Sequence, residues 1–326
     1  MFRWGVLSTA KIAREHVIPA IQQSHRGVVA GIASRDVARA RAVAECCQIP
    51  RVYDNYDAML RADDIDGVYI AVTTAQHVEW TLAAIAAGKP VLCEKPLALD
   101  TDTVARVADA ADAAGVLVAE AFMVHYHPQW ARVRDWIAEG AIGELKHVQG
   151  AFSYRNVDPD NMRNRPELGG GAVPDIGVYP VVTTRFVSGC EPLSASARID
   201  RDPEFGTDRY AAFTLAFPGF DAQFYVSSQM HLYQSMHFAG TTGWIAVDAP
   251  FNAGNYGHAV VRLNTPAGEQ VVRFADNQYA LQADAFAEAA TGGANRCFTL
   301  ENSVHNQRAI DAIYRAAASA QVETVA

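Results

Sequence analysis

Apolar residues follow two different rhythms along the chain, and the change falls near residue 147. Before it, short apolar runs alternate with segments whose apolar residues recur every three or four positions, which is the period of a helix. We expect strands at 2–7, 28–34, 67–73, 90–93 and 116–120 and helices at about 11–24, 36–47, 55–62, 76–87 and 101–114. Strands that are apolar throughout are typical of a parallel sheet covered on both faces. The first part is therefore predicted to be a doubly wound α/β domain.

After residue 147, polarity alternates from one residue to the next in "HVQGAFSY", "AAFTLAFP" and "DAQFYVSSQM". A period of two predicts half-buried strands, and the turn residues between them favour antiparallel pairing. Residues 121–146 are expected to form a helical bridge, and further helices are expected at about 171–187, 281–292 and 300–319. We therefore predict two domains, 1–121 and 122–326. The second is an α+β domain with an open, mostly antiparallel sheet, and its last helices can pack back on the first domain.

The strands of the second part also predict an oligomer. Apolar alternation at 211–231 ("AAFTLAF…AQFYVSSQMHL") indicates that the sheet face turned away from the helices is covered as well. A second subunit is the simplest cover for such a face. We expect a homodimer, or a tetramer built from dimers.

Composition narrows the function classes. The chain has 326 residues and a formal net charge of −9, which disfavours nucleic acids and anionic membranes as partners. It has no apolar run of about twenty residues and no N-terminal leader pattern, so we expect a cytoplasmic protein. Its five cysteines lack CxxC spacing, which favours a reducing compartment and gives no zinc motif.

The stretch "RWGVLSTAKIAREHVIPAI" turns from the first strand directly into a helix. Dinucleotide-binding turns carry glycines at three positions, which are Ser8, Ala10 and Ala13 in this chain. These small residues still let the backbone approach a phosphate, and Ser8 adds a hydroxyl. The turn by itself is equally consistent with a nucleotide site and with a packing turn.

The end of the second strand bears on the choice of cofactor. It reads "IASRD", with Ser34 and Arg35 where an NAD site usually carries an acidic residue for the ribose 2′-hydroxyl. A hydroxyl and a guanidinium instead suit a 2′-phosphate, and Arg39 lies one helical turn further on. Asp36 is expected to cap the next helix. This arrangement favours NADP over NAD, with a solvated Arg35 as the alternative interpretation.

Two further stretches carry candidate catalytic groups. "GKPVLCEKPLALD" places Glu94 and Lys95 at the end of a strand, where ligands bind in parallel sheets. "LGGGAVPDIGVYPV" delivers the chain into a helix on which Asp175 and Tyr179 are four residues apart and share one face.

With these residues the chain resembles the glucose–fructose oxidoreductase and inositol dehydrogenase family, often called Gfo/Idh/MocA. The resemblance covers nearly the whole chain and rests on "EKP" at 94–96, "EAFM" at 120–123, "NMR" at 161–163, "GGGAVPDIGVYP" at 169–180 and "GTTG" at 240–243. With tyrosine as the last residue of D-x-x-x-Y, the chain resembles one branch of the family. That branch contains glucose–fructose oxidoreductases, NADP-dependent xylose dehydrogenases and dimeric dihydrodiol dehydrogenases. The resemblance implies an N-terminal Rossmann domain that holds a dinucleotide at residues 8–13.

Two segments depart from the family pattern. The usual "TPN" after the third strand reads Thr73–Thr74–Ala75, which bears on how the ribose side is held. The "MYR" of many relatives reads Met123–Val124–His125, which bears on substrate identity.

The implied reaction moves a hydride between a nicotinamide and a carbinol carbon, and a side chain must take the hydroxyl proton. We predict Tyr179 as that group, with the Lys95 ammonium lowering its pKa from near 10. Asp175 orients the lysine or a substrate hydroxyl. The alternatives are a surface lysine, an aspartate that only favours the helix start, and a packed core tyrosine.

The predicted catalytic residues are Lys95, Asp175 and Tyr179. The predicted cofactor contacts are Ser8, Thr9, Ala10, Lys11, Ile12, Ser34, Arg35, Arg39, Thr73, Thr74, His77, Glu94 and Lys95. The predicted substrate contacts are Lys95, His125, Tyr154, Arg163, Asp175 and Tyr179. His77 lies near the cofactor or, as the alternative, caps the helix at 76–87. No metal is predicted, because His125, His127 and Glu120 lack a further ligand with suitable spacing.

The predicted function is an NADP(H)-dependent oxidoreductase acting on a sugar, polyol or vicinal diol, of the aldose 1-dehydrogenase or keto-sugar reductase type, with NAD(H) as the alternative cofactor. The alternative functions are a trans-dihydrodiol dehydrogenase acting on aromatic diols, a redox-neutral NAD-assisted glycosidase and a non-catalytic NADP sensor.

Overall fold

The chain forms two compact units in the computed structural model, which describes residues 1–326. The first unit is Met1–Tyr126 with Asn277–Val304, and the second is His127–Asp276 with His305–Ala326. The predicted boundary between residues 121 and 122 lies close to Tyr126, and the first unit also includes a segment from near the C-terminus. Helix α9 (Leu300–Ser319) begins in the first unit and ends in the second.

The first unit contains a six-stranded sheet in the order β3-β2-β1-β4-β5-β6, with every pair parallel. Its strands are β1 (Phe2–Leu7), β2 (Gly27–Ala33), β3 (Arg51–Tyr53), β4 (Gly67–Ile70), β5 (Val91–Cys93) and β6 (Val118–Glu120). This order reverses direction next to β1, as in dinucleotide-binding sheets. The predicted doubly wound parallel sheet is confirmed. Strand β3 was not predicted, because it is only three residues long and begins with an exposed arginine.

Five helices connect these strands: α1 (Ile18–Gln23), α2 (Val37–Cys46), α3 (Tyr56–Leu60), α4 (Thr74–Ala86) and α5 (Thr101–Ala114). The first unit also contains the 3-10 turn η2 (Met123–Tyr126) after β6 and, from later in the chain, helix α8 (Gln278–Ala290). The helix predicted at 11–24 contains a π-helical stretch, η1 (Ala13–Val17), before α1. Asp36 caps α2 as predicted, since its carboxylate accepts from the Arg39 backbone N–H at 3.0 Å.

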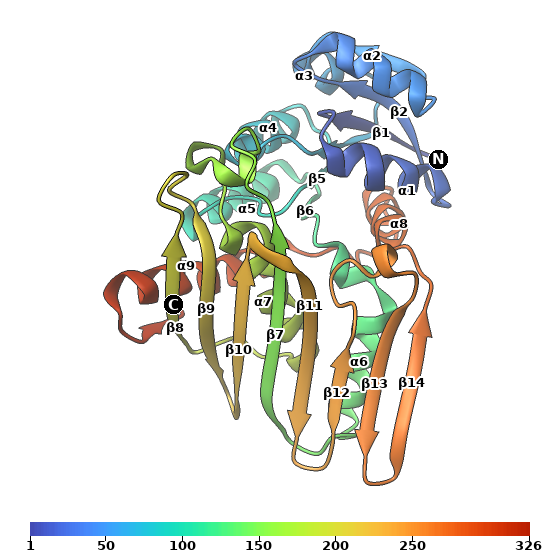
Figure 1. The fold of residues 1–326 in the computed structure, drawn as a ribbon. Helices are drawn as coiled ribbons and strands as arrows, with labels where there is room; N and C mark the ends of the chain where they lie inside the picture. The colour runs from blue at the N-terminus through green and yellow to red at the C-terminus, as the bar shows by residue number, and fades with distance from the viewer. The chain divides into compact units, whose positions relative to one another are not determined.

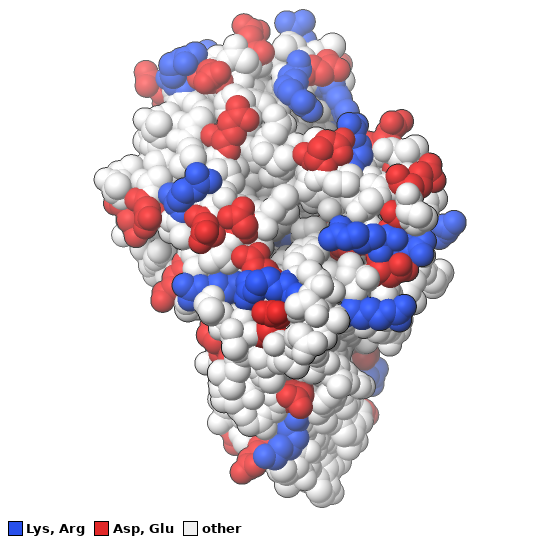
Figure 2. Space-filling view, turned by 90° about the vertical axis from the view of Figure 1, so that its left-hand side faces the viewer, with Lys and Arg blue, Asp and Glu red and all other residues white.

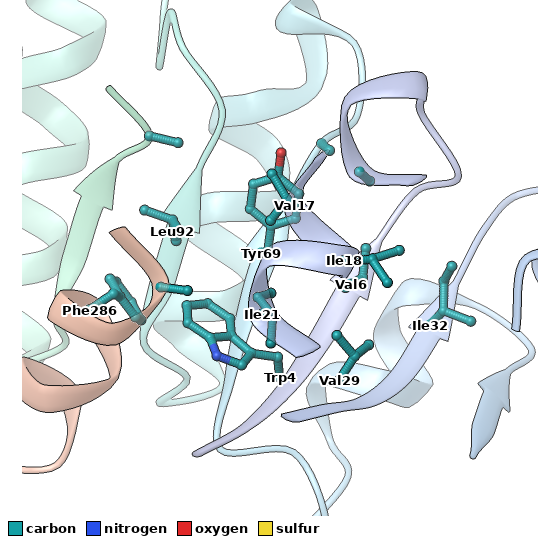
Figure 3. Packing of buried hydrophobic residues seen from close by; sticks show 14 of the residues in the cluster. Trp4, Val6, Val17, Ile18, Ile21, Val29, Ile32, Tyr69, Leu92 and Phe286 are labelled. Carbon is teal, nitrogen blue, oxygen red and sulfur yellow. The ribbon is translucent and has the colours of Figure 1, made fainter. Parts of the chain in front are cut away.

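The core of the first unit is closed by a helix from far along the sequence. Trp4 on β1 and Ile21 on α1 are fully buried, and so is Phe286 on α8. The rings of Trp4 and Phe286 lie 5.1 Å apart, and Figure 3 shows them side by side. Burial of large apolar side chains stabilises a fold by about 2 kcal/mol each, so α8 is an integral part of this unit.

The second unit contains a nine-stranded sheet in the order β14-β13-β12-β11-β7-β10-β9-β8-β15, of which Figure 1 labels the strands from β14 to β8. The strands are β7 (Leu145–Arg155), β8 (Ser194–Arg201), β9 (Asp208–Phe217), β10 (Phe220–Ser227), β11 (Gln229–Gly240), β12 (Trp244–Val247), β13 (Ala259–Thr265), β14 (Gly268–Phe274) and β15 (Glu323–Thr324). Only β7 and β10 pair in parallel. The predicted mostly antiparallel sheet is confirmed.

The helices of the second unit are α6 (Pro128–Ala138), α7 (Val178–Ser188) and the later part of α9. Short turns are η3 (Met162–Asn164), η4 (Pro166–Leu168), the π-helical η5 (Val173–Gly177) and η6 (Ala253–Tyr256). The bridge predicted at 121–146 is therefore helical mainly at α6. One face of the sheet is buried, with Phe213, Leu215 and Phe224 among its residues. Thr214 and Gln223 point to the other face, where Thr214 is partly exposed and Gln223 is exposed.

The surface carries both signs of charge. On the side drawn in Figure 2, basic and acidic side chains are interspersed rather than gathered into one basic area. None of the helices combines the length and the apolar character that crossing a membrane requires.

Candidate active site

The turn after β1 keeps a glycine-like backbone without glycine. Ser8 has a φ of 103°, in the region that glycine adopts readily, and its N–H donates to the Ala33 carbonyl at 2.8 Å. The Ser8 Oγ accepts from the Ala10 N–H at 3.1 Å, which leaves the hydroxyl proton able to donate. The Arg14 side chain donates to the Thr9 carbonyl at 3.0 Å. The turn is therefore internally braced, and a small residue lies at each of its key positions.

Positive charge lies next to the end of β2. Ser34 is buried, and its Oγ accepts from the Asp36 N–H at 3.3 Å. Arg35 and Arg39 are exposed, and neither guanidinium forms an ion pair in the structure. Unpaired guanidinium groups can form bidentate bonds to a phosphate. These residues could hold the 2′-phosphate of a dinucleotide bound at the Ser8 turn.

The turn after β5 carries Lys95 and is surrounded by buried polar groups. The Tyr69 hydroxyl donates to the Glu94 carboxylate at 2.7 Å. The Leu97 N–H donates to Glu120 Oε1 at 2.8 Å. His77 Nδ1 lies 2.8 Å from the Pro96 carbonyl, so this turn is fixed on both sides of Lys95.

His77 is almost fully buried, and burial lowers its pKa to about 4, so the ring is neutral at pH 7. Its other ring nitrogen lies 3.2 Å from the Val72 carbonyl. Both nitrogens therefore face carbonyl oxygens, and the ring caps no helical N–H. The capping alternative is wrong, and the contact with a cofactor stays a prediction.

In the second unit, three predicted substrate residues meet at one carboxylate. The Tyr154 hydroxyl donates to Asp175 Oδ2 at 2.6 Å, and Arg163 Nε donates to the same oxygen at 2.7 Å. The Asp175 side chain is 14% exposed and that of Arg163 is 41% exposed, so the cluster is open on the arginine side. Asp175 raises the pKa of Arg163, and burial together with Asp175 raises the pKa of Tyr154, which stays a neutral phenol.

Tyr179 lies near the start of α7 and is held by aromatic packing. Its ring is 5.5 Å from the ring of Phe251 and 5.9 Å from that of Phe152. Tyr179 follows Asp175 by four residues, and its aromatic neighbour Phe152 lies on β7, the strand that also carries Tyr154. The prediction placed Asp175 and Tyr179 on one continuous α-helix. Asp175 instead lies in the π-helical turn η5, and π turns recur at functional sites.

The three-glycine run before η5 allows close backbone contacts. A Cβ on Gly170 would lie 2.5 Å from the Arg163 carbonyl oxygen, and one on Gly171 would lie 2.2 Å from Asp208 Oδ1. Asp208 is buried and accepts from the Val173 N–H at 2.6 Å and from the Tyr314 hydroxyl at 3.0 Å. The glycines therefore let the segment that carries Arg163 pack against the start of the helical region that carries Asp175.

The remaining predicted residues lie as follows. The Thr73 hydroxyl bonds the Gln76 side chain at 3.2 Å, and Thr74 begins α4. Lys11 is exposed, with its ammonium 3.7 Å from Glu15, and Ile12 is half-buried. His125 packs edge-on against Tyr126 and Phe298.

His127 belongs to a structural contact at the start of α6. Its Nδ1 accepts from the Gln129 N–H at 3.2 Å, and burial lowers its pKa to about 4. No three His, Cys, Asp or Glu side chains are placed together so as to hold a metal ion.

Comparison with known proteins assigns the family. The Gfo/Idh/MocA model described as "Oxidoreductase family, NAD-binding Rossmann fold" matches residues 2–122, and the model of the family's C-terminal domain matches residues 130–246. The chain belongs to the Gfo/Idh/MocA oxidoreductase family. The resemblance drawn from the sequence motifs is therefore confirmed, as is the combination of a Rossmann domain with a C-terminal α+β domain.

Members of this family with related sequences include sugar enzymes. The chain is 36% identical to "D-xylose 1-dehydrogenase (NADP(+)) 2" of Haloferax volcanii, over 96% of this chain and 97% of that protein. It is 32% identical to a dTDP-3,4-didehydro-2,6-dideoxy-α-D-glucose 3-reductase of Actinomadura kijaniata, over 95% and 94% of the two chains. A solved structure of the 3-ketoreductase KijD10 from that organism, with NADP and TDP-benzene, superposes with a TM-score of 0.90 at 28% identity and covers 97% of each chain.

Proposed function

We propose that this member of the Gfo/Idh/MocA family is an NADP(H)-dependent oxidoreductase that acts on a CH–OH group of a sugar, polyol or vicinal diol. Two features carry the proposal. Lys95 lies on a turn fixed by buried hydrogen bonds, and Asp175, Arg163 and Tyr154 form one hydrogen-bonded cluster, with Tyr179 four residues after Asp175. A protein that only senses a cofactor has no need of this set.

The residues of the first unit fit NADP. The small-residue turn at Ser8 and Ala10 suits a pyrophosphate, whereas the unpaired Arg35 and Arg39 suit a 2′-phosphate. Lys11, Thr73, Thr74, Glu94 and His77 are the further proposed contacts around it. The names of the Haloferax enzyme and of the KijD10 structures both specify NADP. When bound, the nicotinamide donates or accepts the hydride.

Tyr179 is the proposed proton acceptor. A free phenol has a pKa near 10, and a nearby ammonium favours the phenolate, which is the proposed role of Lys95. Solved forms of KijD10 include variants of one lysine and one tyrosine, whose separation along that chain equals that of Lys95 and Tyr179. This agreement in spacing supports the assignment.

The cluster at Asp175 is the proposed recognition site for substrate hydroxyls. Its carboxylate and guanidinium are fixed by mutual hydrogen bonds, and such groups discriminate against ligands that cannot satisfy them. Arg163 neutralises Asp175, which favours an uncharged polyhydroxylated substrate over an acidic one. Trans-1,2-dihydrobenzene-1,2-diol dehydrogenase of Homo sapiens is 28% identical over 76% of this chain, so an aromatic diol is the second candidate substrate.

The test is an absorbance assay at 340 nm with NADP⁺ or NAD⁺ and a panel of aldoses, inositols and a trans-dihydrodiol, followed by keto-sugars with NADPH. We expect reduction of NADP⁺ by one member of the panel and a loss of turnover of about a thousandfold in Tyr179→Phe. Tyr225→Phe, on the opposite face of the sheet, is the matched control and should turn over normally. Cofactor binding without turnover in either direction would favour the NADP sensor.

We also propose that a second copy of the chain covers the outer face of the nine-stranded sheet. Tyr210 and Tyr225 stack there with their rings 6.5 Å apart, and nearby Leu232 and Tyr233 on β11 are about half exposed. An apolar and aromatic face of this kind is typical of an interface. Light scattering should give the mass of a dimer or of a tetramer, and a monomer would contradict the proposal.

A further inference from the structure

Polar side chains from three separate elements fix the turn that carries Lys95. Tyr69 on β4 bonds the side chain of Glu94, immediately before the lysine. His77 on α4 and Glu120 at the end of β6 bond the backbone of the next two residues, Pro96 and Leu97. Each of the three is at most 4% exposed. Burying three polar side chains is costly unless their bonds are satisfied, so their convergence here points to a requirement for an exact backbone position.

Glu120 is the only one of the three that can carry a full charge at this turn near pH 7. It ends β6 opposite Cys93 of β5, and Ser303 on α9 bonds its carboxylate from a further side. The charged and titratable groups that act on it are Lys95, Glu94 and the Cys93 thiol. A buried carboxylate beside a lysine contributes both a hydrogen-bond acceptor and a compensating negative charge.

We propose that Glu120 is a positioning residue: it holds the Lys95 turn through the Leu97 N–H and, when ionised, stabilises the Lys95 ammonium. The structural part of this inference stands on the geometry alone. Its consequence for catalysis rests on the proposed function, in which that ammonium stabilises the Tyr179 phenolate.

The ionisation of Glu120 falls in an accessible pH range. Burial raises its pKa to about 7, opposed by the hydrogen bonds from Ser303 and Leu97 and by the charge of Lys95. Glu94 acts in the opposite sense and raises it. The Lys95 ammonium therefore gains a negative neighbour as the pH passes through this range, and the electronic environment of its ε-carbon must change at the same pH.

The test observes Lys95 directly in the full chain. The protein has only four lysines, Lys11, Lys89, Lys95 and Lys146, so labelling with [ε-¹³C]lysine gives few NMR resonances, and Lys95→Arg assigns the relevant one. Resonances are followed from pH 5 to pH 9 in the wild type, Glu120→Gln and Glu120→Ala. Asp66→Asn is the matched control, because Asp66 also accepts a backbone N–H at 2.8 Å, from Arg3 in the same unit.

We expect the Lys95 resonance to move with a midpoint near pH 7 in the wild type and in Asp66→Asn, and this step to be absent in both Glu120 variants. Glutamine keeps an acceptor for the Leu97 N–H, so Glu120→Gln should retain most of kcat, whereas Glu120→Ala should lose at least about tenfold. KM and cofactor Kd should stay within about threefold in both, because the lost function is orientation.

A Lys95 resonance that shows no step near pH 7 and does not respond to either Glu120 variant would overturn the proposal. If all lysine resonances of Glu120→Ala lose their dispersion, the variant is unfolded. The proposal is then tested by whether the pH step of the Lys95 resonance is absent in Glu120→Gln. Because the resonances are read without substrate, a chain that turns over no sugar would refute the proposed function and leave the positioning result intact.

Discussion

The turn that carries Lys95 and the helical segment that carries Asp175 and Tyr179 are held in place in different ways. Around Lys95, buried side chains mostly bond to the backbone, at Pro96 and Leu97. Around Asp175 the bonds run from side chain to side chain, and the ring of Tyr179 is fixed by packing. The backbone near Asp175 is shaped by glycines and has one buried polar anchor, the Asp208 carboxylate, which accepts from the Val173 N–H at 2.6 Å.

This difference predicts different failures. A bond to the backbone constrains the path of the turn, so its loss affects orientation. At Leu97 the loss also leaves a buried N–H without a partner. A bond between side chains fixes only those two groups, so its loss affects recognition more than the fold. The glycines tolerate almost no added volume, because their neighbours are backbone or buried carboxylate atoms.

The largest expected effect is that of Gly171→Ala. The new Cβ would lie 2.2 Å from Asp208 Oδ1, and the φ of 138° is strained for alanine. We expect a loss of about 4 kcal/mol in the free energy of unfolding, measured by urea denaturation. The control is Gly189→Ala, which has a φ of 65° and open space around it and should lose about 1 kcal/mol. Equal losses in the two variants would show that the contact with Asp208 is unimportant.

Glu120→Gln should change how stability depends on pH. The pKa of Glu120 rises from 4.5 to about 7 on folding, so its stabilising contribution is complete below pH 4.5 and is lost as the pH rises through 7. Between pH 5 and pH 8 the free energy of unfolding of the wild type should fall by about 2.5 kcal/mol more than that of the variant.

Asp66→Asn serves as the control for this measurement. The pKa of Asp66 is lowered by Arg3, so its contribution changes only at more acidic pH. The wild type and Asp66→Asn should therefore show parallel slopes between pH 5 and pH 8. Parallel slopes for the wild type and Glu120→Gln would argue against a raised pKa at Glu120.

Asp175→Asn tests the cluster of the second unit. The amide cannot compensate the Arg163 charge, so we expect kcat/KM for the sugar to fall roughly thirtyfold. This corresponds to a loss of about 2 kcal/mol in transition-state stabilisation, and the cofactor Kd should change little. Asp200→Asn removes an exposed ion pair with Arg209 at 2.9 Å and should change kcat/KM by less than about twofold. A normal kcat/KM in Asp175→Asn would exclude this carboxylate from substrate recognition.

The smallest expected effect concerns the cofactor. Removing the unpaired charge in Arg35→Ala should weaken NADP⁺ binding about tenfold, or about 1.4 kcal/mol, and leave NAD⁺ binding unchanged. Fluorescence titration measures both dissociation constants. Arg41→Ala is the control, because Arg41 is exposed on the following helix α2. An equal effect on both cofactors would place Arg35 away from the 2′-phosphate.

Local capping and periodicity made much of the fold predictable. Helix α5 was predicted at 101–114 and has those bounds, because Asp100 caps its start and Gly115 in a left-handed conformation ends it. The π-helical turns η1 and η5 were not predicted, since the extra residue in such a turn depends on tertiary contacts and leaves no periodic pattern.

For the candidate site, the sequence pointed to residue types more than to their arrangement. Asp175, Arg163 and Tyr154 were each predicted, but sequence spacing could not show that they meet at one carboxylate oxygen, because they come from different segments. Glu120 was considered only beside His125 and His127 as a metal candidate. The sequence did contain one indication of its role: Glu120 ends the apolar stretch "VLVAE". A charged residue next to a buried strand usually has a buried partner.

Phe286 has a consequence for how the protein is made. Trp4 lies on the first strand, and its aromatic neighbour Phe286 comes from α8, so most of the chain must leave the ribosome before this contact can form. Until then the nascent sheet presents apolar surface to solvent, the condition under which chaperones bind. A fragment that ends at Tyr126 would leave this apolar surface exposed, because it lacks α8. We therefore expect the first unit to fold as an isolated domain only if α8 is included.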